Sequence, residues 1–133
     1  MRYLHDCYLS KDRSLTVEFL FVDLGVSRGW RAYILSPIDY GFQSSAQIDV
    51  HKFSENDEYM ERLVTDFKYN NPPIGGVQRR CRDVEYVCWT KKVYSLDQMM
   101  SIASSWADIT AYYIRYGGSF PEIQRKLSWE GVI

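Results

Sequence analysis

The chain has 133 residues, a formal net charge of −1 and an aromatic content of 16%. A chain of this length buries roughly two thirds of its unfolded surface, so we predict a single α+β domain spanning residues 1–133. The small and well-mixed charge excludes a field strong enough to recruit nucleic acid or an anionic membrane over the whole surface.

The first half of the sequence predicts four β-strands. Alternating side chains over residues 3–9 predict the first strand, and residues 15–24 predict the second. Because residues 19–22 are apolar at every position, the second strand should be buried on both faces. Residues 30–35 and 46–51 predict two more strands. The short connections between these strands indicate an antiparallel meander.

The hydrophobic period changes after the fourth strand. Ser54 can cap a helix, and apolar side chains recur at i, i+3, i+4 and i+7 from Met60 to Phe67, which predicts an amphipathic helix. Pro72 ends this helix, because the residue before a proline resists helical geometry. Residues 84–90 then predict a fifth strand.

A long helix with clear start and stop signals follows. Ser95 is a good N-cap residue, and Gln98 completes a capping box. Gly117 supplies a left-handed stop, and Arg115 lies where the helix dipole favours a cation. The apolar side chains of this helix form one buried stripe at helical spacing. These side chains are Leu96, Met99, Met100, Ala103, Trp106, Ala107, Thr110, Tyr113 and Ile114.

The opposite stripe of the long helix is polar. It contains Asp108, Tyr112 and Arg115, which we interpret as a solvated face. Residues 121–127 predict a short C-terminal helix. The predicted order is therefore β-β-β-β-α-β-α with that short helix at the end. We expect an α+β fold in which a mostly antiparallel β-meander of four to five strands is packed on one face by two main helices.

The cysteine content and the apolar segments indicate a cytoplasmic protein. Three cysteines are an odd and sparse set, which fits reduced thiols better than a disulfide framework. Residues 1–6 lack the apolar core of a signal peptide. No window approaches the ~20 apolar residues that cross a bilayer, so we expect no membrane contact.

Residues that could bind a metal have unsuitable spacing. His5, Cys7, Cys81 and Cys88 are the right types for zinc, but His-x-Cys is too tight and the interval from Cys81 to Cys88 is too wide. The alternative interpretation treats Cys7 and Cys88 as small buried hydrophobic residues. We therefore predict no metal.

Motifs for catalysis are weak. Cys81 is the likeliest reactive thiol, because neighbouring arginines lower a thiol pKa. The sequence contains neither the G-x-S-x-G nor the H-E-x-x-H motif, and its glycine pairs lack the residues that surround a phosphate. We predict no cofactor and no catalytic residue. A thiol- or metal-dependent enzyme is the third alternative.

Nucleic-acid binding is the second alternative. The densest basic run contains Arg79, Arg80 and Arg82, and a nucleic-acid-binding accessory protein would use these arginines together with aromatic side chains of the sheet. The run needs further cations to form a continuous footprint. Lys91 and Lys92 would extend it from the other end of the predicted strand at residues 84–90, and Arg28, Arg31 or Lys68 would be needed to join the two patches. Arg31, Tyr33 and Trp89 would supply stacking planes.

A non-enzymatic protein–protein module is the leading hypothesis, with another protein or a second copy of this chain as the partner. Trp30, Tyr40 and Phe42 flank a proline–glycine loop and are the aromatic residues least needed for periodic core packing. We therefore predict that they form an exposed binding patch. Residues 3–9 and 46–51 are the candidates for a free sheet edge.

Overall fold

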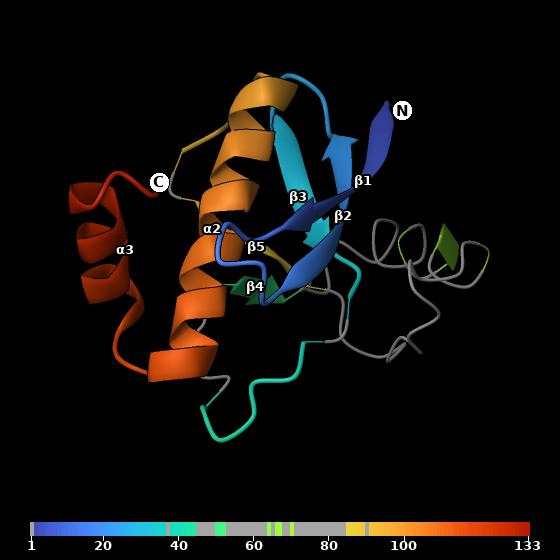
Figure 1. Cartoon of the computed structure of the whole chain (residues 1–133). Helices are drawn as coiled ribbons and strands as arrows, with labels where there is room; N and C mark the ends of the chain where they lie inside the picture. Colours follow the sequence, from blue (N-terminus) through green and yellow to red (C-terminus); the bar gives the residue numbers. More distant parts are fainter. Residues whose placement is uncertain are drawn as a thin grey trace.

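The computed structural model of the chain describes residues 2–36, 38–44, 50–52, 64, 66, 67, 70, 85–89 and 91–133. These residues form an antiparallel sheet and two helices, arranged as Figure 1 shows. The strands are β1 (Tyr3–Leu9), β2 (Thr16–Asp23), β3 (Trp30–Ile34), β4 (Val50–Lys52) and β5 (Glu85–Val87). The helices are α2 (Leu96–Tyr116) and α3 (Phe120–Trp129).

The sheet begins as a meander and then departs from sequence order. Its strands lie in the order β1-β2-β3-β5-β4, and every neighbouring pair is antiparallel. The α+β class with a mostly antiparallel sheet is therefore confirmed. The last strand in sequence lies between β3 and β4, which leaves β1 and β4 as the edges among the described strands.

Strand β2 is buried on both faces, as predicted. Its side chains from Val17 to Val22 are all buried, and alternate ones enter two separate cores. Phe19 lies under α2, where its ring centroid is 6.2 Å from that of Trp106. Leu20 faces the other way, into a smaller core that includes Val64. This double burial makes β2 the centre of the packing.

The segment predicted as a helix over residues 54–67 is described only in part. Val64, Asp66 and Phe67 are helical, while residues 53–63 and 65 lie outside the described residues. Val64 belongs to the smaller core, and Phe67 packs against it. These two side chains therefore cover the face of the sheet opposite α2. Of the fourth predicted strand, which spans residues 46–51, residues 46–49 also lie outside the described residues.

Helix α2 begins and ends where its sequence signals indicate. The Ser95 hydroxyl accepts a hydrogen bond from the backbone N–H of Gln98 at 3.4 Å, and Gly117 ends the helix with φ +71°. The side chains of α3 that face inward are Phe120, Ile123 and Leu127. Figure 1 shows α2 lying between the sheet and α3. Within the described part of the chain, no helix is long and apolar enough to span a membrane.

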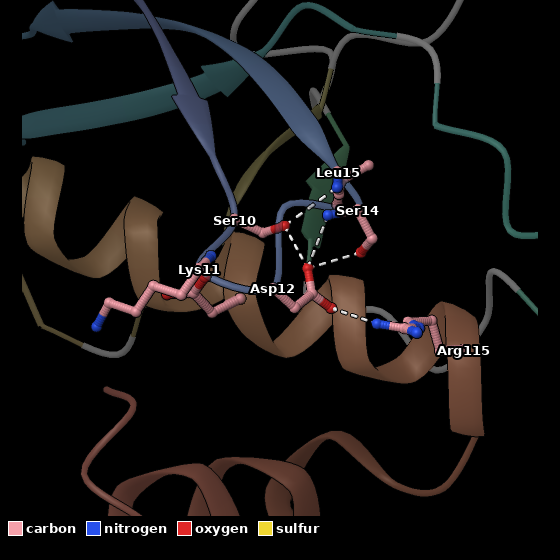
Figure 2. Close-up of polar contacts among 7 residues, drawn as sticks. Ser10, Lys11, Asp12, Ser14, Leu15 and Arg115 are labelled. Atoms are coloured by element: carbon pink, nitrogen blue, oxygen red, sulfur yellow. Dashed lines mark hydrogen bonds and ion pairs between the residues drawn. The ribbon is translucent and has the colours of Figure 1, made fainter.

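The polar stripe of α2 is solvated only at Arg115, and the burial of Asp108 corrects the sequence interpretation. Asp108 is only 5% exposed, because the β1–β2 turn covers it. Its carboxylate accepts hydrogen bonds from the Tyr8 hydroxyl and from the backbone N–H of Lys11, both at 2.8 Å. Figure 2 shows Arg115 pointing from α2 toward Asp12 in the same turn, with 3.6 Å between the charged atoms. Asp108 and Arg115 therefore connect the β1–β2 turn to the helix.

Asp12 organises the turn itself. Its Oδ1 atom accepts hydrogen bonds from the hydroxyls of Ser10 and Ser14, each at 2.7 Å, as drawn in Figure 2. Burial alone would raise the pKa of the Asp12 carboxyl. The hydrogen bonds from Ser10 and Ser14, together with the positive charge of Arg115, more than offset this effect. The pKa of Asp12 consequently lies below its ordinary value.

Candidate functional site

A pocket rich in cations lies at the end of the sheet where β3 begins and β5 ends. Its volume is about 260 Å³. We call it the basic pocket and define it by Arg28, Arg31, Tyr86, Trp89, Lys91 and Lys92. None of the described residues that line it is acidic. The pocket therefore combines positive charge with aromatic surface.

Strand pairing explains why residues distant in sequence meet there. Strands β3 and β5 are antiparallel, with Tyr33 opposite Tyr86, so the start of one lies beside the end of the other. The backbone N–H of Trp30 donates a hydrogen bond to the carbonyl of Val93 at 2.6 Å. This bond holds the linker between β5 and α2 against the first residue of β3.

Gly29 permits this close approach. Its φ of +75° is in the left-handed region, which favours glycine, and a Cβ atom there would overlap the carbonyl oxygen of Val93. The β2–β3 turn therefore brings Arg28 to one side of the pocket. The linker brings Lys91 and Lys92 to another side, and both lysines are exposed.

The aromatic residues of the pocket have different roles. The Arg31 guanidinium lies over the Tyr86 ring, 4.4 Å from its centroid, which orients both side chains. Trp89 is 45% exposed, so part of its ring faces solvent at the rim. An exposed indole beside several cations can stack with a planar group whose neighbouring charges are negative.

The structure places the three predicted patch residues in different environments. Trp30 is only 9% exposed, and the expectation that it lies on the surface is wrong. Strand alternation places it with Ala32 in the core under α2. Tyr40 is half-buried against the same core, and burial followed by the charge of Glu85 raises its pKa to about 12. Phe42 is exposed, as predicted.

The predicted basic run lies outside the described residues, which include none of Arg79, Arg80, Cys81 and Arg82. The structure nevertheless brings together four of the cations that we expected to extend it. These are Arg28, Arg31, Lys91 and Lys92. Of the proposed stacking planes, Tyr33 is fully buried and Trp89 is exposed. Sequence reasoning missed Tyr86, because a position in strand β5 does not reveal which neighbour its ring contacts.

The residues considered for metal binding have other contacts. His5 Nε2 lies 2.6 Å from Glu18 Oε2 on the face of the sheet opposite α2. Cys7 and Cys88 are half-buried. Of the residues that the structure describes, no group of three His, Cys, Asp or Glu side chains is placed to hold a metal ion.

The edge of β1 is protected at its centre. Asp23 N–H bonds to Arg2 O and Ser10 N–H bonds to Leu15 O, so the even-numbered residues of this strand pair with β2 and the odd-numbered ones face outward. The outward N–H of Cys7 donates to Oδ1 of Asp6 at 2.8 Å. A side chain that occupies an edge amide opposes the addition of another strand.

The comparisons with known proteins find no relative. No family model, curated protein or solved structure matches the chain. The function must therefore be inferred from the chemistry of the site itself.

Proposed function

We propose that this protein binds single-stranded nucleic acid at the basic pocket. The observation that carries the proposal is the convergence of four cations with the exposed ring of Trp89. Proteins that bind single strands combine a positively charged groove for the phosphates with aromatic rings on which bases stack. The basic pocket offers both features within about 260 Å³.

The exposed indole favours an unpaired strand over a duplex. In a duplex the faces of the bases are stacked on each other, so a tryptophan at the rim reaches only base edges and the backbone. An unpaired base can leave its neighbours and stack on Trp89 while its phosphates face Lys91 and Lys92. A small inorganic anion would use the cations alone and would gain nothing from the indole.

Fluorescence anisotropy with labelled single-stranded and duplex oligonucleotides of the same sequence tests this proposal. We expect the wild-type protein to bind the single strand more tightly. Trp89→Ala should weaken that binding by about 1–3 kcal/mol, which is about 5- to 150-fold. Trp129→Ala is the matched control, because Trp129 is also an exposed tryptophan and lies on α3, outside the basic pocket.

Two outcomes would overturn the proposal. One is an absence of measurable binding at low salt, where phosphate contacts are strongest. The other is equal binding by the wild-type protein and the Trp89→Ala variant. Circular dichroism of each variant shows whether the fold is intact.

Protein binding is a second candidate function, supported by the exposure of Phe42. An exposed large aromatic residue in a loop is typical of a protein contact. Because Asp6 opposes the addition of a strand at the edge of β1, the loop that carries Phe42 is the better surface for a protein contact. If the partner is a second copy of the chain, Phe42→Ser should abolish a concentration-dependent increase in mass. If it is another protein, a partner captured after nuclease treatment should be lost with the same substitution.

A further inference from the structure

A second hollow lies beside the basic pocket at the same end of the sheet. Its volume is about 640 Å³, and we call it the tyrosine hollow. The start of β1, the start of β3 and the segment that leads into α2 surround it. Its lining residues are Arg2, Tyr3, Leu4, Trp30, Tyr94 and Leu96.

The two hollows share a wall and a chain segment. Trp30 lines both of them. The linker before α2 then continues from one to the other, since Lys91 and Lys92 line the basic pocket and Tyr94 lines the tyrosine hollow. The linker before α2 therefore borders both hollows in turn.

The tyrosine hollow differs from the basic pocket in charge. Its cation, Arg2, forms an ion pair with Asp23, and the Arg2 guanidinium lies 5.6 Å from the centroid of the Trp30 ring. Hydrogen bonds from the Gly25 backbone and Arg2, and the positive charge of Arg2, hold the pKa of Asp23 below its ordinary value. The carboxylate thus stays ionised at neutral pH and offsets the charge of Arg2.

Exposed aromatic surface is the main feature that remains in this hollow. Tyr94 is 60% exposed, whereas the ring of Tyr3, which is 59% exposed, lies edge-on to the ring of Phe67 with 5.9 Å between the centroids. A ring with little net charge around it is suited to the face of a base, whereas the exposed Lys91 and Lys92 of the neighbouring pocket are suited to phosphates.

We infer that the two hollows form one continuous track for a single strand, in which bases beyond those held at the basic pocket stack on Tyr94. The inference rests on the proposed function and adds the number of nucleotides that the protein binds. The three residue steps from Lys91 to Tyr94 span at most about 11 Å. A stacked strand rises about 3.4 Å per nucleotide along its axis, so this length of linker corresponds to at most about four nucleotides.

Binding measured as a function of oligonucleotide length tests the track. A dinucleotide occupies the basic pocket alone, whereas an octanucleotide also reaches the tyrosine hollow. Tyr94→Ala should weaken binding of the octanucleotide about five-fold or more and leave binding of the dinucleotide unchanged. Tyr94→Phe should keep wild-type affinity, because it retains the ring. Tyr116→Ala is the matched control, since Tyr116 is similarly exposed at the far end of α2.

The possible results separate the two proposals. If Tyr94→Ala binds the octanucleotide as tightly as the wild-type protein does, the track is wrong and the basic pocket stands. The same conclusion follows if the substitution weakens both oligonucleotides equally. If the wild-type protein binds neither oligonucleotide, the proposed function fails and the track fails with it.

Discussion

The backbone N–H of Trp30 donates a hydrogen bond to the carbonyl oxygen of Val93 across 2.6 Å, and this contact joins the first residue of β3 to the linker that precedes α2. Because the linker carries Lys91 and Lys92, the hydrogen bond positions two of the four cations of the basic pocket. The same bond places Trp30 between the basic pocket and the tyrosine hollow.

Gly29→Ala should disturb this junction. A left-handed φ destabilises a residue with a Cβ by about 1–2 kcal/mol, and the overlap with the Val93 carbonyl should add about 1–3 kcal/mol. We expect a loss of stability in urea unfolding and weaker oligonucleotide binding. Gly25→Ala is the control, because Gly25 has a φ of +89° in the same turn but no neighbour within 4 Å. Equal effects of the two substitutions would contradict the role of the Val93 contact.

The salt dependence of binding should report the cations of the basic pocket. For single strands, the slope of log K against log[salt] is about −0.7 per neutralised phosphate, so the exposed Lys91 and Lys92 together contribute about −1.4 to the slope. The double substitution Lys91→Ala/Lys92→Ala should make the slope shallower by about 1.4. Lys126→Ala on α3 should leave it unchanged, because Lys126 pairs with Glu130. Anisotropy titrations over a range of salt concentrations measure these slopes.

Tyr8→Phe should destabilise the protein and change its alkaline unfolding. Removal of the Tyr8 hydroxyl leaves the buried Asp108 with one hydrogen bond fewer, which costs about 1–3 kcal/mol. Burial, followed by the hydrogen bond and charge of Asp108, raises the pKa of Tyr8. The folded protein thus holds this proton more tightly than the unfolded chain does. The contribution of this proton to the stability of the fold is fully present below about pH 10 and is lost as the pH rises above that value.

Urea unfolding at neutral pH and above about pH 10 measures this effect. The stability difference between the wild-type protein and Tyr8→Phe should shrink at the higher pH. Tyr40, whose pKa is raised to about 12, remains in the Tyr8→Phe variant. The stability of this variant should therefore still fall to some extent at alkaline pH. A difference that does not depend on pH would show that the Tyr8 proton makes no such contribution.

Asp12→Asn should remove part of the acid sensitivity of the fold. Because the pKa of Asp12 is lowered in the folded protein, its contribution to stability is present above the unfolded pKa of about 4 and is lost as the pH falls through the folded value. We expect Asp12→Asn to lower the stability of the fold at neutral pH by about 1 kcal/mol. The stability of this variant should also fall less than that of the wild-type protein as the pH drops below about 4.

Arg115→Gln distinguishes the hydrogen bonds of Asp12 from its ion pair. The Arg115 side chain is half-exposed and the ion pair is long, so we expect Arg115→Gln to change the stability of the fold by less than about 0.5 kcal/mol. Thermal unfolding followed by circular dichroism compares the two variants. A larger effect of Arg115→Gln than of Asp12→Asn would show that the ion pair, and not the serine hydrogen bonds, holds the turn.

Asp6→Ala should promote self-association. The substitution removes the carboxylate that accepts the outward N–H of Cys7 and so makes the edge of β1 a better template for another strand. Sedimentation velocity over a range of concentrations, with reductant to exclude disulfides, measures the effect. Asp39→Ala is the control, because Asp39 accepts the N–H of Gly41 in a loop. Equal sedimentation of both variants would contradict the protective role of Asp6.

Patterns within a short stretch of sequence predicted the elements of the fold. The capping signals at Ser95 and Gly117 depend on residues within one helical turn, and both are confirmed. The apolar run in β2 reveals that the strand is covered on both sides, because side-chain direction alternates along any strand. Such features depend on local geometry, which a sequence displays directly.

Contacts between distant segments account for what the sequence left undetermined. Trp30 is buried rather than exposed because it faces the core beneath α2, and Asp108 is buried because the β1–β2 turn folds over it. The basic pocket likewise exists because β5 lies beside β3, which brings Arg31 close to Trp89 and Lys91. Sequence alone therefore predicted strands β1, β2 and β3 and helices α2 and α3. Only the tertiary structure decided which cations and rings share one surface, because the pairing of strand ends is a long-range choice.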